Sequence, residues 1–231
     1  MRAPRPEIIA HRGLHEVARE NTVDAFERAA SVGASAIELD VHATSEGVVV
    51  VHHDFDILSG NVPLPLKAAT YEQARSAANA QGFDLPKLTD VLNQFAGRLK
   101  VYIEVKAAGI ELEVARIIRE SECELAVHSF DHRIVKTIRD FVPGGQTGVL
   151  TVGRPIDPVS IIRAASATDY WPQVDFVDKD LVDSIHESGG RLIVWTANRP
   201  DQWERLTSLG VDGICTDRPD NLRDWQQSTS A

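Results

Sequence analysis

The sequence of 231 residues contains only two cysteines, and its apolar runs fall well short of the about 20 residues that a membrane-spanning helix needs. Cys123 and Cys215 lie far apart and are each flanked by strand-like residues. This favours buried thiols in a reducing compartment over a disulfide or a metal clip. Residues 1–7 carry basic side chains without a following hydrophobic stretch, which is not typical of a signal peptide. We therefore expect a cytoplasmic protein without stable membrane insertion.

Basic residues are also scarce relative to acidic ones, with 24 Lys and Arg against 34 Asp and Glu and a net charge of −10. The net negative charge of such a chain repels the phosphate backbone of a nucleic acid, so we expect no nucleic-acid partner. A small phosphate-bearing ligand would have to be held by local groups and a metal ion. The hydrophobic content of 43% with 25% charged residues is typical of a globular protein with a sizeable core.

Short strand-like segments alternate with helix-like segments along the whole chain. The expected strands cover residues 7–10, 35–40, 100–105, 124–128, 146–150, 168–171, 191–195 and 213–216. Helical periodicity occupies residues 22–31, 110–120, 131–140, 158–165, 179–188 and 199–208. Eight units that recur mostly at about 22 residues favour a closed (β/α)8 TIM barrel, although an open doubly wound sheet has similar local patterns.

The connection between the second and third expected strands is longer than the others. Residues 55–85 contain Pro63, Pro65 and a helical piece at residues 71–80. We expect a short insertion over one end of the barrel, within a single barrel domain that covers residues 1–231.

Polar side chains follow several of the expected strands. Glu38 and Asp40 are two residues apart, so their carboxylates point to the same side of one strand. His11 and Arg12 end the first strand, and His53 follows an apolar run at residues 48–51. In parallel barrels the active site lies at the carboxyl ends of the strands. Together these groups indicate a cation site with an acid/base pair and an anion clamp, which suits phosphodiester chemistry.

A third carboxylate extends the cluster. Glu104 and Lys106 repeat the spacing of two residues at the end of the third strand. Three carboxylates from neighbouring strands suit one hard divalent cation, Mg²⁺ or Ca²⁺. Left unpaired, three such acids in one mouth would raise each other's pKa. The alternative is that each acid forms an ion pair with Arg12 or Lys106, and we favour the metal site because three acids lie in the same register.

The histidines divide into two groups. His11 and His53 fit a general acid and general base, because imidazole titrates near neutral pH. His52 points to the opposite side of its strand from His53, so only one of the two can serve the site. Ser129 and Trp195 are candidate substrate contacts by their position at the mouth alone. The histidines that lack convergent partners in the sequence, which we assign to structural or surface positions, are His15, His42, His128, His132 and His186.

An ordered set of motifs extends over nearly the whole chain. In chain order they are His11-Arg12-Gly13, Glu20-Asn21-Thr22, Ala36-Ile37-Glu38-Leu39-Asp40-Val41, Val51-His52-His53-Asp54, Leu85-Pro86-Lys87-Leu88, Tyr102-Ile103-Glu104-Val105-Lys106, His128-Ser129-Phe130, Val194-Trp195-Thr196 and Asp212-Gly213-Ile214-Cys215-Thr216-Asp217. This set resembles the glycerophosphodiester phosphodiesterase family. The resemblance implies a (β/α)8 barrel that hydrolyses glycerophosphodiesters to an alcohol and glycerol 3-phosphate, usually with a divalent cation. The roles that it implies by motif position are an acid/base pair at His11 and His53, metal ligands at Glu38, Asp40 and Glu104, and phosphate contacts at Arg12 and Lys106.

One segment departs from the family pattern. After His53-Asp54 the family usually continues with a leucine, an arginine and a threonine, whereas residues 55–60 of this chain contain neither the arginine nor the threonine. The pocket for the alcohol group is therefore open to question, and an apolar rim at residues 55–66 would favour hydrophobic alcohols.

Two other functions remain as alternatives. A lysophospholipase D-like activity on lipid phosphodiesters would need an apolar entrance, for which the candidate residues are Phe55, Ile57, Leu58, Leu64 and Leu66. A barrel that binds phosphorylated ligands without turnover is the second alternative, and the intact His11 and His53 argue against it.

Overall fold

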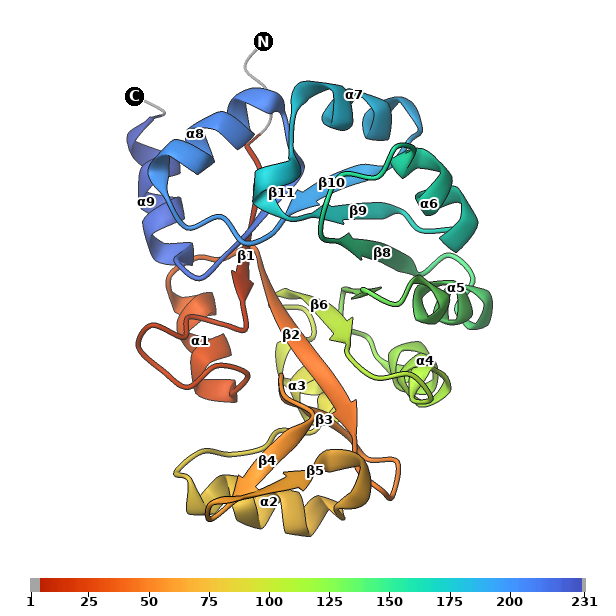
Figure 1. The fold of residues 1–231 in the computed structure, drawn as a ribbon. Helices are drawn as coiled ribbons and strands as arrows, with labels where there is room; N and C mark the ends of the chain where they lie inside the picture. Colours follow the sequence, from red (N-terminus) through yellow and green to blue (C-terminus); the bar gives the residue numbers. More distant parts are fainter. Residues whose placement is uncertain (1–4, 230–231) are drawn as a thin grey trace.

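A closed barrel of parallel strands forms the centre of the molecule in the computed structural model, which describes residues 5–229 (Figure 1). β1 pairs with both β2 and β11, and these two pairings close the sheet. The strands of the barrel, in their order around it, are β1 (Glu7–His11), β2 (Ala36–Ala43), β6 (Lys100–Val105), β7 (Leu125–Ser129), β8 (Gln146–Thr151), β9 (Asp169–Pro172), β10 (Arg191–Val194) and β11 (Gly213–Thr216). The expected (β/α)8 architecture is confirmed, including the sixth strand expected at residues 168–171, which is β9.

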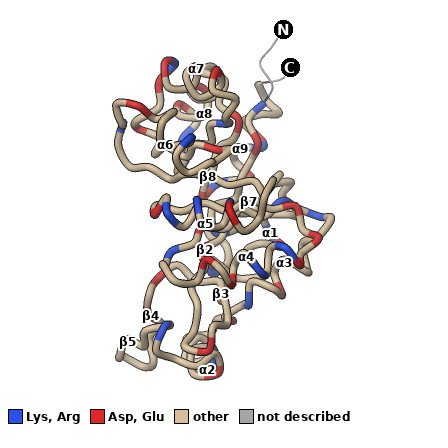
Figure 2. The backbone as a smooth tube through the Cα atoms, turned by 90° about the vertical axis from the view of Figure 1, so that its right-hand side faces the viewer, with Lys and Arg blue, Asp and Glu red and all other residues tan. Residues whose placement is uncertain are grey.

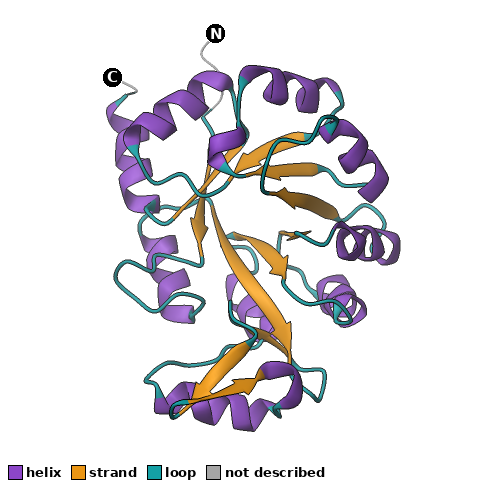
Figure 3. Ribbon diagram, in the orientation of Figure 1, coloured by secondary structure: helices purple, strands orange, loops and turns teal. Residues whose placement is uncertain are grey.

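A ring of helices surrounds the barrel (Figure 3). They are α1 (Val23–Ser31), α3 (Leu88–Phe95), α4 (Glu111–Glu120), α5 (His132–Phe141), α6 (Pro158–Ala165), α7 (Lys179–Glu187), α8 (Pro200–Leu209) and α9 (Pro219–Ser228). Several begin where a side chain accepts a backbone N–H, as Thr22, Asp131, Asp157 and Asp178 do. The sequence pattern does not predict α9, whose buried apolar residues are Pro219 and Leu222.

The strands alternate between two apolar layers. Ile37 and Leu39 of β2 face outwards and pack in the core between strands and helices. Tyr102, Trp171 and Cys215 belong to a second cluster inside the barrel. Because successive side chains alternate, the residues between the outward-facing ones point into the barrel and reach its mouth at the carboxyl ends of the strands.

The expected insertion lies between β2 and β6. It contains β3 (Val49–Val51), which pairs antiparallel with the end of β2, then the hairpin of β4 (Asp56–Ser59) and β5 (Val62–Pro65), the 3-10 turn η1 (Leu66–Ala68) and α2 (Tyr71–Ala80). These elements project from one side of the barrel (Figure 1). The helix is as expected. The hairpin is not evident from the sequence, because Pro63 and Pro65 disfavour a strand except at the edge of a sheet.

The insertion has a small core of its own. Ile57 and Leu66 are buried in it, and Leu64 packs against it. The expected apolar entrance is therefore wrong for Ile57 and Leu66, because these side chains stabilise the insertion instead of facing a ligand. Leu58 is 45% exposed, and Phe55 is 62% exposed.

The surface carries charges of both signs. Figure 2 shows acidic and basic residues interspersed over the helices and loops. Cys123 and Cys215 are free and buried, as expected. Within residues 5–229, no helix is both long and apolar enough to cross a membrane.

Candidate active site

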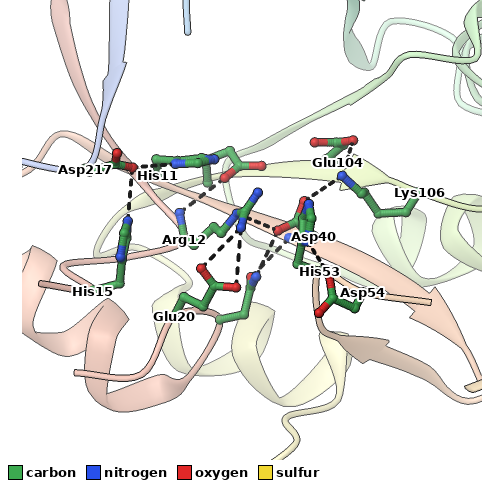
Figure 4. A network of polar contacts seen from close by, with 12 residues as sticks. His11, Arg12, His15, Glu20, Asp40, His53, Asp54, Glu104, Lys106 and Asp217 are labelled. Atoms are coloured by element: carbon green, nitrogen blue, oxygen red, sulfur yellow. Dashed lines mark hydrogen bonds and ion pairs between the residues drawn. The ribbon is translucent and has the colours of Figure 1, made fainter. Parts of the chain in front are cut away.

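The polar residues at the barrel mouth converge on a cavity of about 160 Å³. Its lining includes residues that the sequence singles out, namely His11, Arg12, Glu38, His53, Glu104, Lys106 and Trp195. Figure 4 shows most of them from close by, with Arg12 and Lys106 on either side of the carboxylate of Asp40. The strands of the barrel thus bring together groups that lie up to about 180 residues apart in the chain.

A tight turn after β1 sets the position of Arg12. Gly13 has φ of 85°, and a Cβ at this position would lie 2.7 Å from the backbone of Ala25 in α1. Only glycine fits such a close approach in the left-handed region. The turn directs the backbone N–H of Arg12 to Oε2 of Glu38 at 3.2 Å. The turn therefore connects the backbone of Arg12 to the carboxylate of Glu38 on the neighbouring strand β2.

The segment from residues 20 to 22 supports the same turn. Glu20 accepts hydrogen bonds from Nη1 of Arg12 at 3.2 and 3.3 Å. Asn21 donates from Nδ2 to Asp40 at 2.8 Å and accepts from the backbone N–H of Asp40 at 3.1 Å. Thr22 caps α1. Each residue of the Glu-Asn-Thr motif thus has a separate structural task.

Asp40 lies between two cations. Its Oδ2 is 3.1 Å from Nε of Arg12, and its Oδ1 is 3.5 Å from Nζ of Lys106. The carboxylate is 1% exposed. Burial alone would raise the pKa of Asp40, but Arg12 and Lys106 together hold it below its usual value. Asp40 therefore resembles an ion-pair partner that orients both cations, although the ion-pair geometry leaves Oδ1 without a hydrogen bond.

Glu38, Glu104 and His128 form a second group of donors at the bottom of the cavity. Their ligand atoms all lie within 4.8 Å of one another, and all three residues are buried. Nε2 of His128 is 3.6 Å from Oε1 of Glu38. Burial and the charge of Asp40 raise the pKa of Glu104 above its usual value, despite its contact with Lys106 at 2.9 Å. Negative charge is thus concentrated where a cation would relieve it.

His11 is held by a carboxylate from the last strand of the barrel. Its Nδ1 lies 2.6 Å from Oδ1 of Asp217, and the same oxygen is 3.0 Å from Nε2 of His15. Asn198 donates to the other oxygen of Asp217 at 2.6 Å. Burial lowers the pKa of His11, but the hydrogen bond to Asp217 and the charge of Glu38 outweigh it, so the pKa is raised. The contact with Asp217 engages Nδ1 of His11 (Figure 4), so Nε2 is the ring nitrogen that remains for a ligand in the cavity.

His53 has a parallel arrangement on the other side of the cavity. Its Nδ1 lies 2.8 Å from Oδ1 of Asp54, and its backbone carbonyl accepts a hydrogen bond from Nε2 of His42 at 3.0 Å. His52 is buried instead, and its ring stacks on Phe83. Of the two adjacent histidines, His53 is therefore the one that faces the cavity, as expected from the alternation of the strand.

Comparison with known proteins agrees with this geometry. The family model described as the glycerophosphoryl diester phosphodiesterase family matches residues 11–221. The chain belongs to this family. A glycerophosphodiester phosphodiesterase of Caldanaerobacter subterraneus subsp. tengcongensis is 30% identical over 93% of this chain and 95% of its own length. One of Bacillus altitudinis is 31% identical, with the same coverage of both chains.

Solved structures agree in fold at lower identity. A glycerophosphodiester phosphodiesterase from Parabacteroides distasonis superposes with a TM-score of 0.88 at 22% identity, over 99% of this chain and 100% of the other. A phosphodiesterase from Oleispira antarctica, solved in complex with sn-glycerol-3-phosphate, has a TM-score of 0.86 at 18% identity, over 97% of each chain.

Ser129 and Trp195, the two candidate substrate contacts from the sequence, differ in what their side chains can contact. Trp195 lines the cavity, with its ring edge-to-face on Phe130. The hydroxyl of Ser129 is buried and donates to the carbonyl of Val105 at 2.8 Å, so it fixes the end of β7 and does not face the cavity. Ser129 thus supports the backbone of the strand end and is absent from the lining of the cavity.

Two residues of the site, His128 and Asp217, are not predicted as site residues from the sequence. His128 has no obvious partner in the sequence, yet it lies beside Glu38 and stacks on Trp171 at 4.3 Å. Asp217 follows the last strand, and that position was the available signal, but its bond to His11 joins residues 206 positions apart. Neither contact can be inferred without the closure of the barrel.

The residues present fit a divalent cation. Glu38 and Glu104 supply the oxygen donors that Mg²⁺ and Ca²⁺ prefer, and His128 offers a nitrogen that suits transition metals. Burial and the charge of Asp40 raise the pKa of Glu104, and a bound cation would favour its ionised form. Asp40, the third expected ligand, is not part of this closest group, and its role as a ligand stays a prediction.

Proposed function

We propose that this protein hydrolyses glycerophosphodiesters to an alcohol and glycerol 3-phosphate, with His11 and His53 as the acid/base pair and with a divalent cation. The observation that supports this most directly is the pair of histidines, each with Nδ1 on a carboxylate, at a cavity that also contains Arg12 and Lys106. The names of the relatives and the sn-glycerol-3-phosphate bound to the Oleispira antarctica neighbour support the same substrate class.

Arg12 and Lys106 bind the phosphate in this proposal. Both line the cavity, and both are oriented by the buried carboxylate of Asp40. A guanidinium and an ammonium fixed before the reaction stabilise the charge that builds on the non-bridging oxygens in the transition state. Contacts with carboxylates raise the pKa of Lys106 above its usual value although burial opposes this, so the ammonium stays charged.

The two histidines move the protons. One Nε2 accepts a proton from the attacking hydroxyl as the new P–O bond forms, and the other donates a proton to the departing alkoxide as the old bond breaks. The attacking group is water or a neighbouring hydroxyl of the substrate. Asp217 and Asp54 each fix the imidazole that they contact, so that Nδ1 is the hydrogen-bonded atom and Nε2 faces the substrate.

Glu38 and Glu104 would hold the cation, with Asp40 or His128 as a further donor. The cation supplies Lewis-acid polarisation of the phosphate when bound. Its positive charge would also offset the burial and the charge of Asp40 that together raise the pKa of Glu104. The identity of the metal is left to experiment.

The proposal is tested by release of glycerol 3-phosphate from glycerophosphodiesters, with and without EDTA. His11→Ala and His53→Ala should each lose about 10²–10⁴ in kcat, the usual contribution of a positioned proton-transfer group. His186→Ala is a matched control, because His186 lies on α7 and contacts Asp212 away from the cavity. More than a tenth of wild-type activity in either active-site variant would remove that histidine from the mechanism, and full activity in EDTA would reject the cation.

The same assay separates the alternatives. Release of choline from a lysophospholipid would support a lysophospholipase D-like activity, for which the apolar side chains of the insertion offer less than expected because Ile57 and Leu66 are buried. Binding of glycerol 3-phosphate without turnover of any diester would identify a non-catalytic phosphate-binding barrel.

A further inference from the structure

A second cavity adjoins the candidate active site on the side of the insertion. It measures about 510 Å³, whereas the cavity between the histidines measures about 160 Å³. The residues of its lining that matter here are His42, Phe55, Pro65, Lys67, Lys106 and Ile110. Lys106 lines both cavities, so the two meet at the side chain that we assign to the phosphate.

The volumes of the two cavities indicate that each holds a different part of the substrate. Cavities that enclose a whole small-molecule ligand usually measure about 300–1,000 Å³, and the catalytic cavity is smaller than this range. A glycerophosphodiester consists of a phosphate with an organic group on each side, so part of it has to extend beyond the histidines. The larger cavity is of the usual size and begins at Lys106.

The wall of the larger cavity is joined to the catalytic residues. Nε2 of His42 donates to the backbone carbonyl of His53, and the ring of His42 lies 4.8 Å from that of Phe55 in an edge-to-face arrangement. Phe55, at the start of the insertion, thus packs against His42, the residue that holds the backbone of His53. A group seated against Phe55 would be attached to a phosphate held between Lys106 and His53.

The chemistry of the lining favours an uncharged group. Phe55, Pro65 and Ile110 supply apolar contact, while Lys67 and Lys106 supply positive charge. Asp56 is the acidic residue of the described lining, and it is exposed. An ammonium group would meet two lysines and one solvated carboxylate, which opposes its binding.

We infer that this second cavity, between the insertion and the loop after β6, receives the alcohol group of the diester and selects uncharged alkyl or aryl alcohols over cationic ones such as choline. The inference rests on the proposed function and adds the class of alcohol to it. Phe55 is the specificity-determining residue, because its large apolar side chain lines the cavity and also contacts His42, which holds the backbone of His53.

The test compares three substrates that differ only in the alcohol: the methyl, n-butyl and choline esters of glycerol 3-phosphate. Each fully buried methylene is worth about fourfold in affinity. The butyl ester should therefore exceed the methyl ester by at least about tenfold in kcat/KM, and the choline ester should not exceed the methyl ester. Equal values for the butyl and methyl esters would overturn the inference while leaving the hydrolase itself intact.

Two phenylalanine variants make the assignment specific. Phe55→Ala should reduce the preference for the butyl over the methyl ester by about threefold to tenfold, because the butyl chain loses more apolar contact than the methyl group does. Phe141→Ala is the matched control, because Phe141 is 50% exposed on α5 and lines a separate surface hollow. Equal losses on both esters in Phe55→Ala would show that the cavity takes the glycerol end instead, and would reject the inference.

Lys67→Glu tests the role of charge. Lys67 is exposed in the larger cavity and does not line the catalytic one. Its reversal should raise kcat/KM for the choline ester relative to the butyl ester by about threefold or more, and an unchanged ratio would reject charge selection. If no diester is cleaved, the proposed function fails. Calorimetric affinities of the intact methyl and butyl esters then test the inference separately. Tighter binding of the butyl ester would support the role of the cavity, and equal binding would reject it.

Discussion

Substitution of Asp217 by asparagine is the sharpest single test of the candidate site. The wild-type carboxylate accepts from Nδ1 of His11 at 2.6 Å and from Nε2 of His15 at 3.0 Å, while Asn198 donates to its other oxygen. Although burial raises it, the hydrogen bonds from the two histidines hold the pKa of Asp217 well below its usual value. The group is therefore ionised throughout any ordinary assay.

Asparagine has the same shape as aspartate, but an NH₂ group that donates replaces one of the two carboxylate oxygens that accept. If its carbonyl stays on Asn198, its NH₂ group faces Nδ1 of His11, which then has to be an acceptor. The proton moves to Nε2, the atom that should exchange a proton with the substrate. Loss of a proton-transfer group costs about 10²–10⁴ in rate, or about 3–5 kcal/mol of activation free energy. We expect Asp217→Asn to lose kcat in this range.

The assay is initial-rate hydrolysis of a glycerophosphodiester at saturating substrate and metal, with thermal unfolding measured in parallel. The lost charge-assisted hydrogen bonds should cost about 1–3 kcal/mol of stability, so the variant should melt lower but remain folded. Asp201→Asn is the matched control, because Asp201 is an exposed partner of Arg199. His15→Gln keeps a donor beside Asp217 and should lose less than tenfold. A folded Asp217→Asn variant with more than a tenth of wild-type kcat would refute the reasoning.

Three further predictions concern the carboxylates and the turn. Glu38→Gln and Glu104→Gln should raise the concentration of Mg²⁺ or Ca²⁺ needed for half-maximal rate, with a parallel loss of affinity in calorimetry; unchanged metal dependence would count against these ligands. Gly13→Ala should lower the stability by about 1–3 kcal/mol in denaturant unfolding, because the Cβ would lie 2.7 Å from α1 at a φ of 85°. Asn21→Ala should cost about 2 kcal/mol in the same measurement by removing two hydrogen bonds to Asp40, and a change below about 0.5 kcal/mol would contradict the importance of that contact.

The barrel could be predicted from the sequence because its signals are local. Side chains alternate between the two faces of a strand, so the apolar residues and the polar residues at the strand end show which positions point inwards. This pattern does not depend on the rest of the chain. This is why Glu38 and Glu104, each between outward-facing apolar neighbours, could be assigned to the interior of the barrel and are found there. The motif at His11, Arg12 and Gly13 likewise depends on a turn that only a few residues define.

The hairpin of the insertion and the helix α9 could not be predicted in the same way. Pro63 and Pro65 lie in β5, where pairing with β4, which itself packs against α2, makes an extended conformation favourable. The expected apolar entrance failed for a related reason, since hydropathy does not distinguish a side chain that lines a cavity from one that packs in a small core. Ile57 and Leu66 belong to the core, and Phe55 to the cavity.

The sequence by itself determined the alternation of strands and helices, the position of the insertion and the type of chemistry at the mouth, because these follow from strand periodicity and from polar residues at strand ends. The tertiary structure decided which of those polar residues are partners. Asp40 lies between Arg12 and Lys106, whereas His128 lies with Glu38 and Glu104. The pairing of β1 with β11 brings Asp217 to His11 across 206 positions. Such contacts depend on how the sheet closes and on its register, and no local pattern of the chain encodes either.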